Sequence, residues 1–174
     1  RARRRLERPA RAQGARPLLR PGAQGAQAYV FYQALTGQKV KRAAPGGEGY
    51  VIDHFNMKVF AGYTQQFVPL LKKSHAPLRA LYNDSYEVYG ANYTPDFFKT
   101  FQKLNGYDLR EHLDVLAKET ATSEGENQIW ADYHRTLEQL LLHQFVNPFA
   151  DWISSMGFQS RNQAHGSPGN LIDI

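Results

Sequence analysis

The stretch NDSYE, residues 83–87, places two carboxylates and a tyrosine directly after an apolar run. The run LRALY, residues 78–82, predicts a buried strand, and Thr94-Pro95-Asp96 predicts a helix start through an N-cap followed by proline. Glu87 therefore comes at a strand exit, between Tyr86 and Tyr89. A carboxyl group beside aromatic surface is desolvated, which favours the protonated form that a general acid needs.

Glycoside hydrolysis is a reaction that such a carboxyl group serves. It normally takes two carboxyl groups, one that protonates the leaving oxygen and one that activates water or attacks the sugar. If Glu87 is one of them, the other candidates at strand ends or in loops are Glu48, Asp53 and Asp84. The spacing along the chain does not favour any one of these three. The residues alone therefore predict a carbohydrate site and leave the second carboxyl group unidentified.

The elements that must position these residues alternate along the chain. Short strands are predicted at residues 50–52, 78–82 and 158–164, with helices between them over residues 55–73, 94–105, 108–117 and 123–156. A further short helix is predicted before Gly37, and Pro148 is expected to bend the longest helix. Alternation of this kind predicts βαβ units, so the fold class is α/β, with a parallel sheet that belongs to a larger domain.

Three polar clusters fall at the predicted strand ends, where parallel α/β sheets bind their ligands. They are Asp53-His54, then Asn83 to Glu87 with Asp84 and Tyr86, and then Arg161-Asn162-Gln163 leading to His165. Each cluster also has a structural interpretation. The aspartates can cap helices or turns, and both histidines can be ordinary structural residues.

The charge and cysteine content limit which binding partners and metal sites the chain is expected to have. The 174 residues carry a formal net charge of +5, but residues 1–20 hold eight Arg and one Glu, which leaves −2 for residues 21–174. The predicted folded part is thus slightly acidic and gives no reason to expect nucleic-acid binding. Residues 1–25 predict a disordered, basic, low-complexity tail, and residues 26–174 the folded domain. Cysteine is absent, which excludes disulfides and thiolate metal sites.

The sequence shows neither the pattern of a signal peptide nor that of a membrane-spanning segment. The tail lacks the apolar segment of a signal peptide, and no apolar run approaches the roughly 20 residues of a membrane span. The sequence therefore predicts no membrane partner.

Three blocks resemble glycoside hydrolase family 106, the α-L-rhamnosidases, in the family's order. They are QKVKRAAPGGEGYVIDHF, NDSYEVYGANYTPDFFKTFQKLNGYDLREHL and RNQAHGSPGNLIDI. The resemblance covers residues 34–174 and leaves out residues 1–25. It implies that the domain is a fragment of a (β/α)₈ TIM-type barrel. It also implies inverting hydrolysis of terminal α-L-rhamnosides, a rhamnose-containing substrate, calcium in the active site and a periplasmic or secreted location.

The resemblance also assigns residues. Glu87 matches an active-site carboxylate, either a general acid or a calcium-linked substrate contact. Residues matched to the substrate pocket are Asp53, His54, Asp84, Tyr86, Asn162 and His165. In the family an acidic segment with another active-site Glu follows the HGSP block, and this chain ends at Ile174 before it. We therefore expect the chain alone to be an inactive fragment, because acid and base act in the same step. Open alternatives are another barrel glycosidase and a non-catalytic sugar-binding member of the family.

Overall fold

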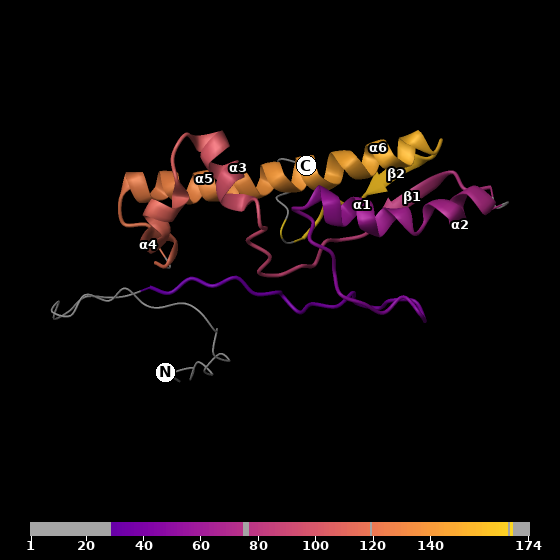
Figure 1. Cartoon of the computed structure of the whole chain (residues 1–174), viewed down its shortest axis with the longest axis horizontal. Coiled ribbons are helices and arrows are strands. Elements are labelled where there is room, and N and C mark those ends of the chain that lie inside the picture. Colours follow the sequence, from indigo (N-terminus) through magenta and orange to yellow (C-terminus); the bar gives the residue numbers. More distant parts are fainter. Residues whose placement is uncertain (1–28, 75–76, 119, 167, 169–174) are drawn as a thin grey trace. The chain divides into compact units, whose positions relative to one another are not determined.

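The computed structural model describes residues 29–74, 77–118, 120–166 and 168. The chain divides into two units, residues 1–30 and 31–174. Only Tyr29 and Val30 of the first unit are described, so the prediction of a disordered tail over residues 1–25 lies outside the described residues. All elements that follow belong to the second unit (Figure 1).

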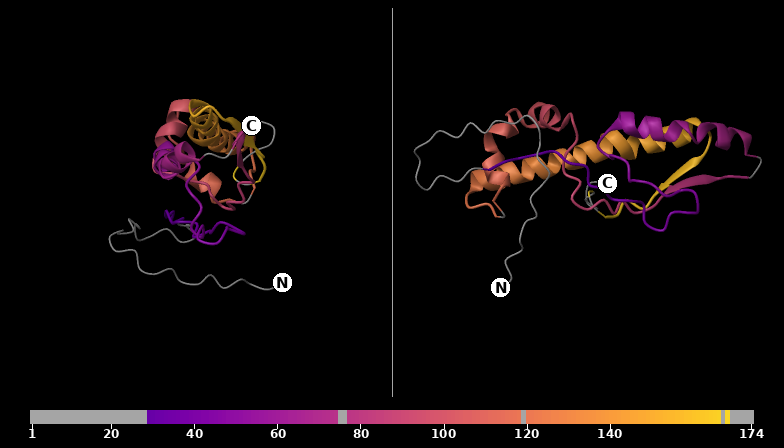
Figure 2. Two further views of the ribbon diagram at one scale, coloured as in Figure 1. Left: turned by 90° about the vertical axis from the view of Figure 1, so that its right-hand side faces the viewer. Right: turned by 60° about the horizontal axis from the view of Figure 1, so that its bottom comes forward.

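Two of the three predicted strands are present and form a parallel pair. Strand β1 (Ala80–Asn83) lies beside β2 (Gln159–Asn162), with Ala80 opposite Gln159 and Asn83 opposite Asn162 (Figure 2). The prediction of a parallel sheet is thereby confirmed for these strands. The predicted strand at residues 50–52 is wrong, because Tyr50 forms only an isolated antiparallel bridge with Lys39.

The predicted helix over residues 55–73 is interrupted. It consists of α1 (Met57–Gln65) and α2 (Val68–Lys73), and Pro69 stands in the first turn of α2, where its missing N–H costs no hydrogen bond. Helix α3 (Phe97–Asn105) ends at Gly106, whose φ of 83° is the left-handed conformation that glycine adopts without strain. Asp96, and not the predicted Thr94, is the N-cap residue of α3.

The C-terminal half is dominated by one continuous helical run. After the 3₁₀ turn η1 (Leu109–His112) and the short α4 (Leu113–Leu116), the chain forms α5 (Glu124–Leu141), the π-helical turn η2 (Leu142–Val146) and α6 (Asn147–Ser155) (Figure 1). The Ser123 side chain accepts a hydrogen bond from the Glu126 N–H, as a capping box predicts. The π turn ends two residues before Pro148, where the sequence predicts a bend.

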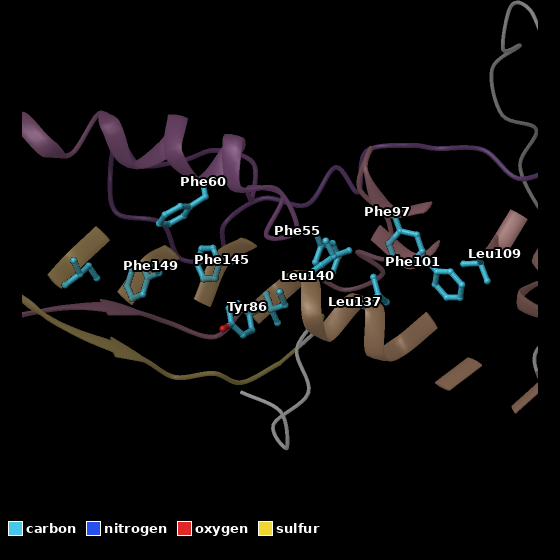
Figure 3. Close-up of a cluster of buried hydrophobic side chains, with 12 residues drawn as sticks. Phe55, Phe60, Tyr86, Phe97, Phe101, Leu109, Leu137, Leu140, Phe145 and Phe149 are labelled. Atoms are coloured by element: carbon cyan, nitrogen blue, oxygen red, sulfur yellow. The ribbon is translucent and has the colours of Figure 1, made fainter. Parts of the chain in front are cut away.

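An aromatic core links these helices to the loop after β1. Figure 3 shows the buried cluster, whose members are Phe55, Phe60, Tyr86, Phe97, Phe101, Leu109, Leu137, Leu140, Leu141, Phe145, Phe149 and Ile153. Tyr86 is its contribution from the strand-exit loop. The apolar residues before Gly37 take no part in it and form no helix, contrary to expectation.

The architecture is therefore a set of helices packed with a small parallel sheet. Within the described residues, no helix has both the length and the apolar character to cross a membrane.

Candidate functional site

The two strands end side by side, and their last residues are joined. Asn83 and Asn162 are register partners, and the Asn83 Nδ2 donates to the Asn162 Oδ1 at 2.9 Å. The backbone N–H of Gln163 donates to the Asn83 carbonyl at 3.0 Å, which extends the pairing by one step beyond β2. This edge brings together the second and third polar clusters predicted from the sequence.

Tyr86 holds the loop after β1 against the loop after β2. Its hydroxyl oxygen accepts a hydrogen bond from the Asn162 Nδ2 at 3.0 Å, and its N–H donates to the His165 carbonyl at 3.0 Å. Figure 3 shows this hydroxyl group at the edge of the aromatic cluster. The side chain is 4% exposed, and burial raises the pKa of Tyr86, while the Asn162 hydrogen bond acts against that rise. The residue therefore stays a neutral phenol at physiological pH.

The Glu87 side chain forms an ion pair. The sequence predicts a carboxyl group desolvated by its aromatic neighbours. Its Oε2 lies 2.9 Å from the Nζ of Lys41, and its side chain is 39% exposed. The Glu87 carboxylate raises the pKa of Lys41, so the ammonium partner is charged at neutral pH. The sequence did not single out Lys41, because no local spacing connects the QKVKR segment with NDSYE.

Backbone strain gathers at the same edge. Among the described non-glycine residues, positive φ angles occur at Arg42 (52°), Glu87 (43°) and Ala164 (51°). Arg42 follows the ion-pair partner of Glu87, and Ala164 precedes His165. Non-glycine residues in this conformation cost about 1 kcal/mol or more each and cluster at functional sites. Glu87 and Ala164 thus mark the loops after β1 and β2 as the candidate site, together with the turn that carries Lys41 and Arg42.

Asp53 has a structural role. Its Oδ1 accepts from the Phe55 N–H at 2.9 Å, and its Oδ2 accepts from the Thr94 hydroxyl at 2.8 Å. These bonds fix the start of α1 to the entry of α3. They correspond to the capping interpretation of Asp53, and the expected substrate contact stays a prediction.

His54 adjoins the site through its ring. It packs edge-on against Phe145, with ring centroids 4.5 Å apart, and against Tyr86 at 5.5 Å. Burial lowers the pKa of His54 to about 4, even though Asp53 acts in the opposite direction. His54 is therefore a neutral supporting residue behind Tyr86 at physiological pH.

Asp84 and His165 lie on the surface of the same loops. Both side chains are exposed. The Asp84 Oδ1 accepts from the Ser85 N–H at 2.9 Å, as in an Asx turn, and His165 contributes its backbone carbonyl to Tyr86. Gly166 lies against the backbone of the Glu87 loop: a Cβ added there would lie 3.4 Å from the Glu87 nitrogen.

A calcium site needs several oxygen ligands around one point. Among the described side chains, no group of three or more His, Cys, Asp and Glu residues is arranged to hold a metal ion. The described residues do not fit a calcium site by themselves. The expectation of calcium stays a prediction about the whole protein.

Comparisons with known proteins decide the family. The sequence model of the α-L-rhamnosidases of glycoside hydrolase family 106 matches residues 28–173. The chain belongs to this family. A solved structure of a rhamnosidase from Novosphingobium sp. PP1Y is similar over 76% of the chain, with a TM-score of 0.64 and 28% sequence identity. A protein of Formosa agariphila named "Putative beta-glucuronidase" is 30% identical over 146 residues, which are 80% of the chain.

The matched relatives are much longer than this family 106 segment. The chain covers 14% of the Novosphingobium rhamnosidase and 12% of the Formosa protein.

Proposed function

We propose that the protein carrying this chain is a glycoside hydrolase that removes terminal α-L-rhamnosyl residues, and that the described loops supply one part of its active site. The family match over residues 28–173 carries the proposal. Glu87 supports it, because a strained, partly exposed carboxylate lies at the shared end of two parallel strands. The (β/α)₈ barrel belongs to the proposal and would extend the β1–β2 pair.

The chemistry that we assign to Glu87 is proton transfer or charge stabilisation at the scissile bond, in an inverting reaction with a second carboxylate. The Tyr86–Asn162 hydrogen bond would hold the Glu87 loop in place during the reaction. In the present geometry Glu87 is ion-paired with Lys41. The Lys41 ammonium group stabilises negative charge at this position, which suits a base or a substrate contact.

Two aryl α-L-rhamnosides test the function and the role together. The full-length protein is expected to hydrolyse both a dinitrophenyl rhamnoside and a rhamnoside with a poor phenol leaving group. Loss of an active-site carboxylate typically lowers kcat at least about 100-fold. Glu87→Gln should slow both substrates if Glu87 is a base, and mainly the poor leaving group if it is an acid. Unchanged rates with both substrates would remove Glu87 from the mechanism.

A second candidate is a hydrolase for another sugar, which the name of the Formosa relative favours. An aryl β-D-glucuronide is therefore the matched alternative substrate, and turnover of it without turnover of rhamnosides would replace our proposal. A non-catalytic sugar-binding protein is the remaining alternative. It would bind rhamnose in a titration and hydrolyse neither substrate.

Calcium and a periplasmic or secreted location belong to the proposal on the family resemblance alone. Loss of rhamnosidase activity after chelation, with recovery on addition of calcium, tests the metal. Fractionation of the source cells tests the location.

A further inference from the structure

A side-chain clamp fixes the turn of Lys41 and Arg42 against the Glu87 loop. The Gln38 carboxamide oxygen accepts from the Tyr89 N–H at 3.0 Å, and the Gln38 Nε2 donates to the Tyr89 carbonyl. One side-chain amide thus pairs with a backbone residue as a neighbouring strand would. The position of the turn beside Glu87 is therefore built into the fold by specific bonds.

Lys41 keeps binding capacity in this position. Its Nζ lies 2.9 Å from Glu87 and 5.3 Å from the centroid of the Tyr89 ring, and the Lys41 side chain is 63% exposed. An ammonium group has three N–H donors, and Glu87 takes one. The exposed side of Lys41 can donate to a further acceptor. The Tyr89 ring is 59% exposed and offers an aromatic surface next to it.

The local charge favours an anion. Lys41 and Arg42 carry two positive charges against the single negative charge of Glu87. Arg42 is exposed, and its backbone is left-handed with φ at 52°. Neutralising Glu87 requires only Lys41, and an exposed salt bridge contributes little to stability. Charge balance at Glu87 therefore does not account for Arg42. A gain in folding stability does not account for it either, or for its left-handed backbone.

We propose that Lys41 and Arg42 form a subsite for the carboxylate group of an acidic sugar, so that the carbohydrate bound beside Glu87 contains a uronic acid residue. The inference rests on the proposed function, because it takes Glu87 as an active-site residue. Lysine supplies a point charge, and arginine a planar fork that matches a carboxylate. The Tyr89 ring provides contact for the apolar face of the same sugar.

A pair of substrates that differ in one group tests the subsite in the full-length protein. They are an α-L-rhamnosyl-uronic acid disaccharide and its methyl ester. We expect wild-type kcat/KM for the acid to exceed that for the ester about tenfold, as a charged hydrogen bond allows. Lys41→Met with Arg42→Met should bring the acid-to-ester ratio near one, and Lys41→Arg should preserve it. Removing Lys41 also takes away the ion-pair partner of Glu87, but this affects the acid and the ester alike. The ratio therefore reports only on recognition of the substrate's carboxylate.

The clamp gives a second variant with a matched control. Gln38→Ala should lower the ratio because the turn loses its anchor, whereas Gln33→Ala, an exposed glutamine in the preceding segment, should leave it unchanged. A wild-type ratio of one or less, or a ratio that the Lys41 and Arg42 substitutions do not change, overturns the proposal.

Calorimetric titration separates this inference from the proposed function. The acid and ester disaccharides are titrated into the wild-type protein and into the Lys41→Met, Arg42→Met variant. If no rhamnoside is hydrolysed but the acid binds about tenfold tighter in wild type only, the proposed reaction fails and the subsite stands. Equal binding of acid and ester refutes the subsite.

Discussion

Tyr86 combines three contacts that belong to different parts of the chain. Its ring packs against Phe145 and His54, its N–H donates to the His165 carbonyl, and its hydroxyl oxygen accepts from Asn162. The loop that carries Glu87 is thus attached both to the core and to the loop after β2. This attachment makes the strained backbone of Glu87 sustainable, because surrounding contacts determine it.

Tyr86→Phe removes the hydroxyl group and keeps the ring. The Asn162 Nδ2 then loses its acceptor in a half-buried position, which should cost about 1 kcal/mol in the free energy of unfolding. Denaturant unfolding of the full-length protein, followed at this domain, measures the loss. Tyr82→Phe is the control, since Tyr82 is 57% exposed and its hydroxyl donates to Gln163 at 3.3 Å. An equal loss in both variants would contradict the role of Tyr86.

His54 predicts a dependence of stability on pH. Its pKa is lowered to about 4 by burial, from an ordinary value of 6.5. The unfolded chain binds a proton at His54 between these values and the folded chain does not, so stability is retained above pH 6.5 and lost as pH falls towards 4. The loss is at most about 3 kcal/mol. Unfolding at pH 7 and 5 measures it. His54→Phe should reduce the pH dependence, and His165→Gln, at an exposed site, should not.

The sequence predicts part of this site. NDSYE and RNQAH were expected to meet at the ends of parallel strands, and the Asn83–Asn162 and Tyr86–Asn162 hydrogen bonds confirm that they do. The partner of Glu87 could not be predicted, because Lys41 reaches it through the tertiary fold. The same holds for Asp53, whose partner Thr94 is 41 residues away along the chain.

At the scale of elements, the π turn η2 carries Phe145, whose ring packs against His54 and Tyr86 beside the candidate site. Pro148 has no N–H, and its ring would clash with the carbonyl of residue 144, so the regular α-helical pattern cannot pass through it unchanged. The turn η2 accommodates this irregularity. Phe145 then lies against His54 and Phe60 and stacks with Phe149. The irregular turn before Pro148 thus carries the Phe145 ring that packs against Tyr86.

A buried polar network joins α5 to the segment after α3. The Asp132 carboxylate, 4% exposed, accepts from the Tyr107 hydroxyl at 3.0 Å and the Gln128 Nε2 at 2.9 Å, and pairs with Arg135. Asp132→Ala leaves these donors without their acceptor and should destabilise the domain by about 3 kcal/mol. Asp151→Ala, at an exposed position of α6, should change stability by less than about 0.5 kcal/mol. Similar unfolding curves for the two variants would contradict the network's importance.

The secondary-structure prediction is wrong before Gly37, where the apolar side chains do not pack into the buried core. The segment before Gly37 has apolar residues at helical spacing, yet Val30 is 82% exposed and Leu35 is 96% exposed. Most helical stability in proteins comes from packing of an apolar face, and no described residue before Gly37 belongs to the buried cluster or packs against it. The predicted strands over residues 78–82 and 158–164 are confirmed as β1 and β2, which pair with each other, while β2 packs against α6 and Leu81 of β1 packs against the buried cluster.

At the scale of the whole molecule, the described sheet consists of one parallel pair. Parallel strands are found almost only in sheets covered on both faces, and two strands by themselves are marginally stable in water. Within the second unit, the side chains of Tyr32 and Leu35 are also largely exposed. The relatives, of which the chain covers 12% and 14%, contain further chain that could cover such surfaces.

Residues 28–173 produced as an isolated polypeptide are therefore expected to lack rhamnosidase activity and to associate in solution. Exposed strand edges pair with other chains, and an inverting reaction needs a second carboxylate that no described contact places beside Glu87. Hydrolysis of an aryl α-L-rhamnoside and size-exclusion chromatography measure the two properties, with the full-length protein as the positive control. A monodisperse segment that unfolds cooperatively would show that the described core suffices for folding. Turnover above that of its Glu87→Ala variant would show that the described residues contain the complete catalytic apparatus.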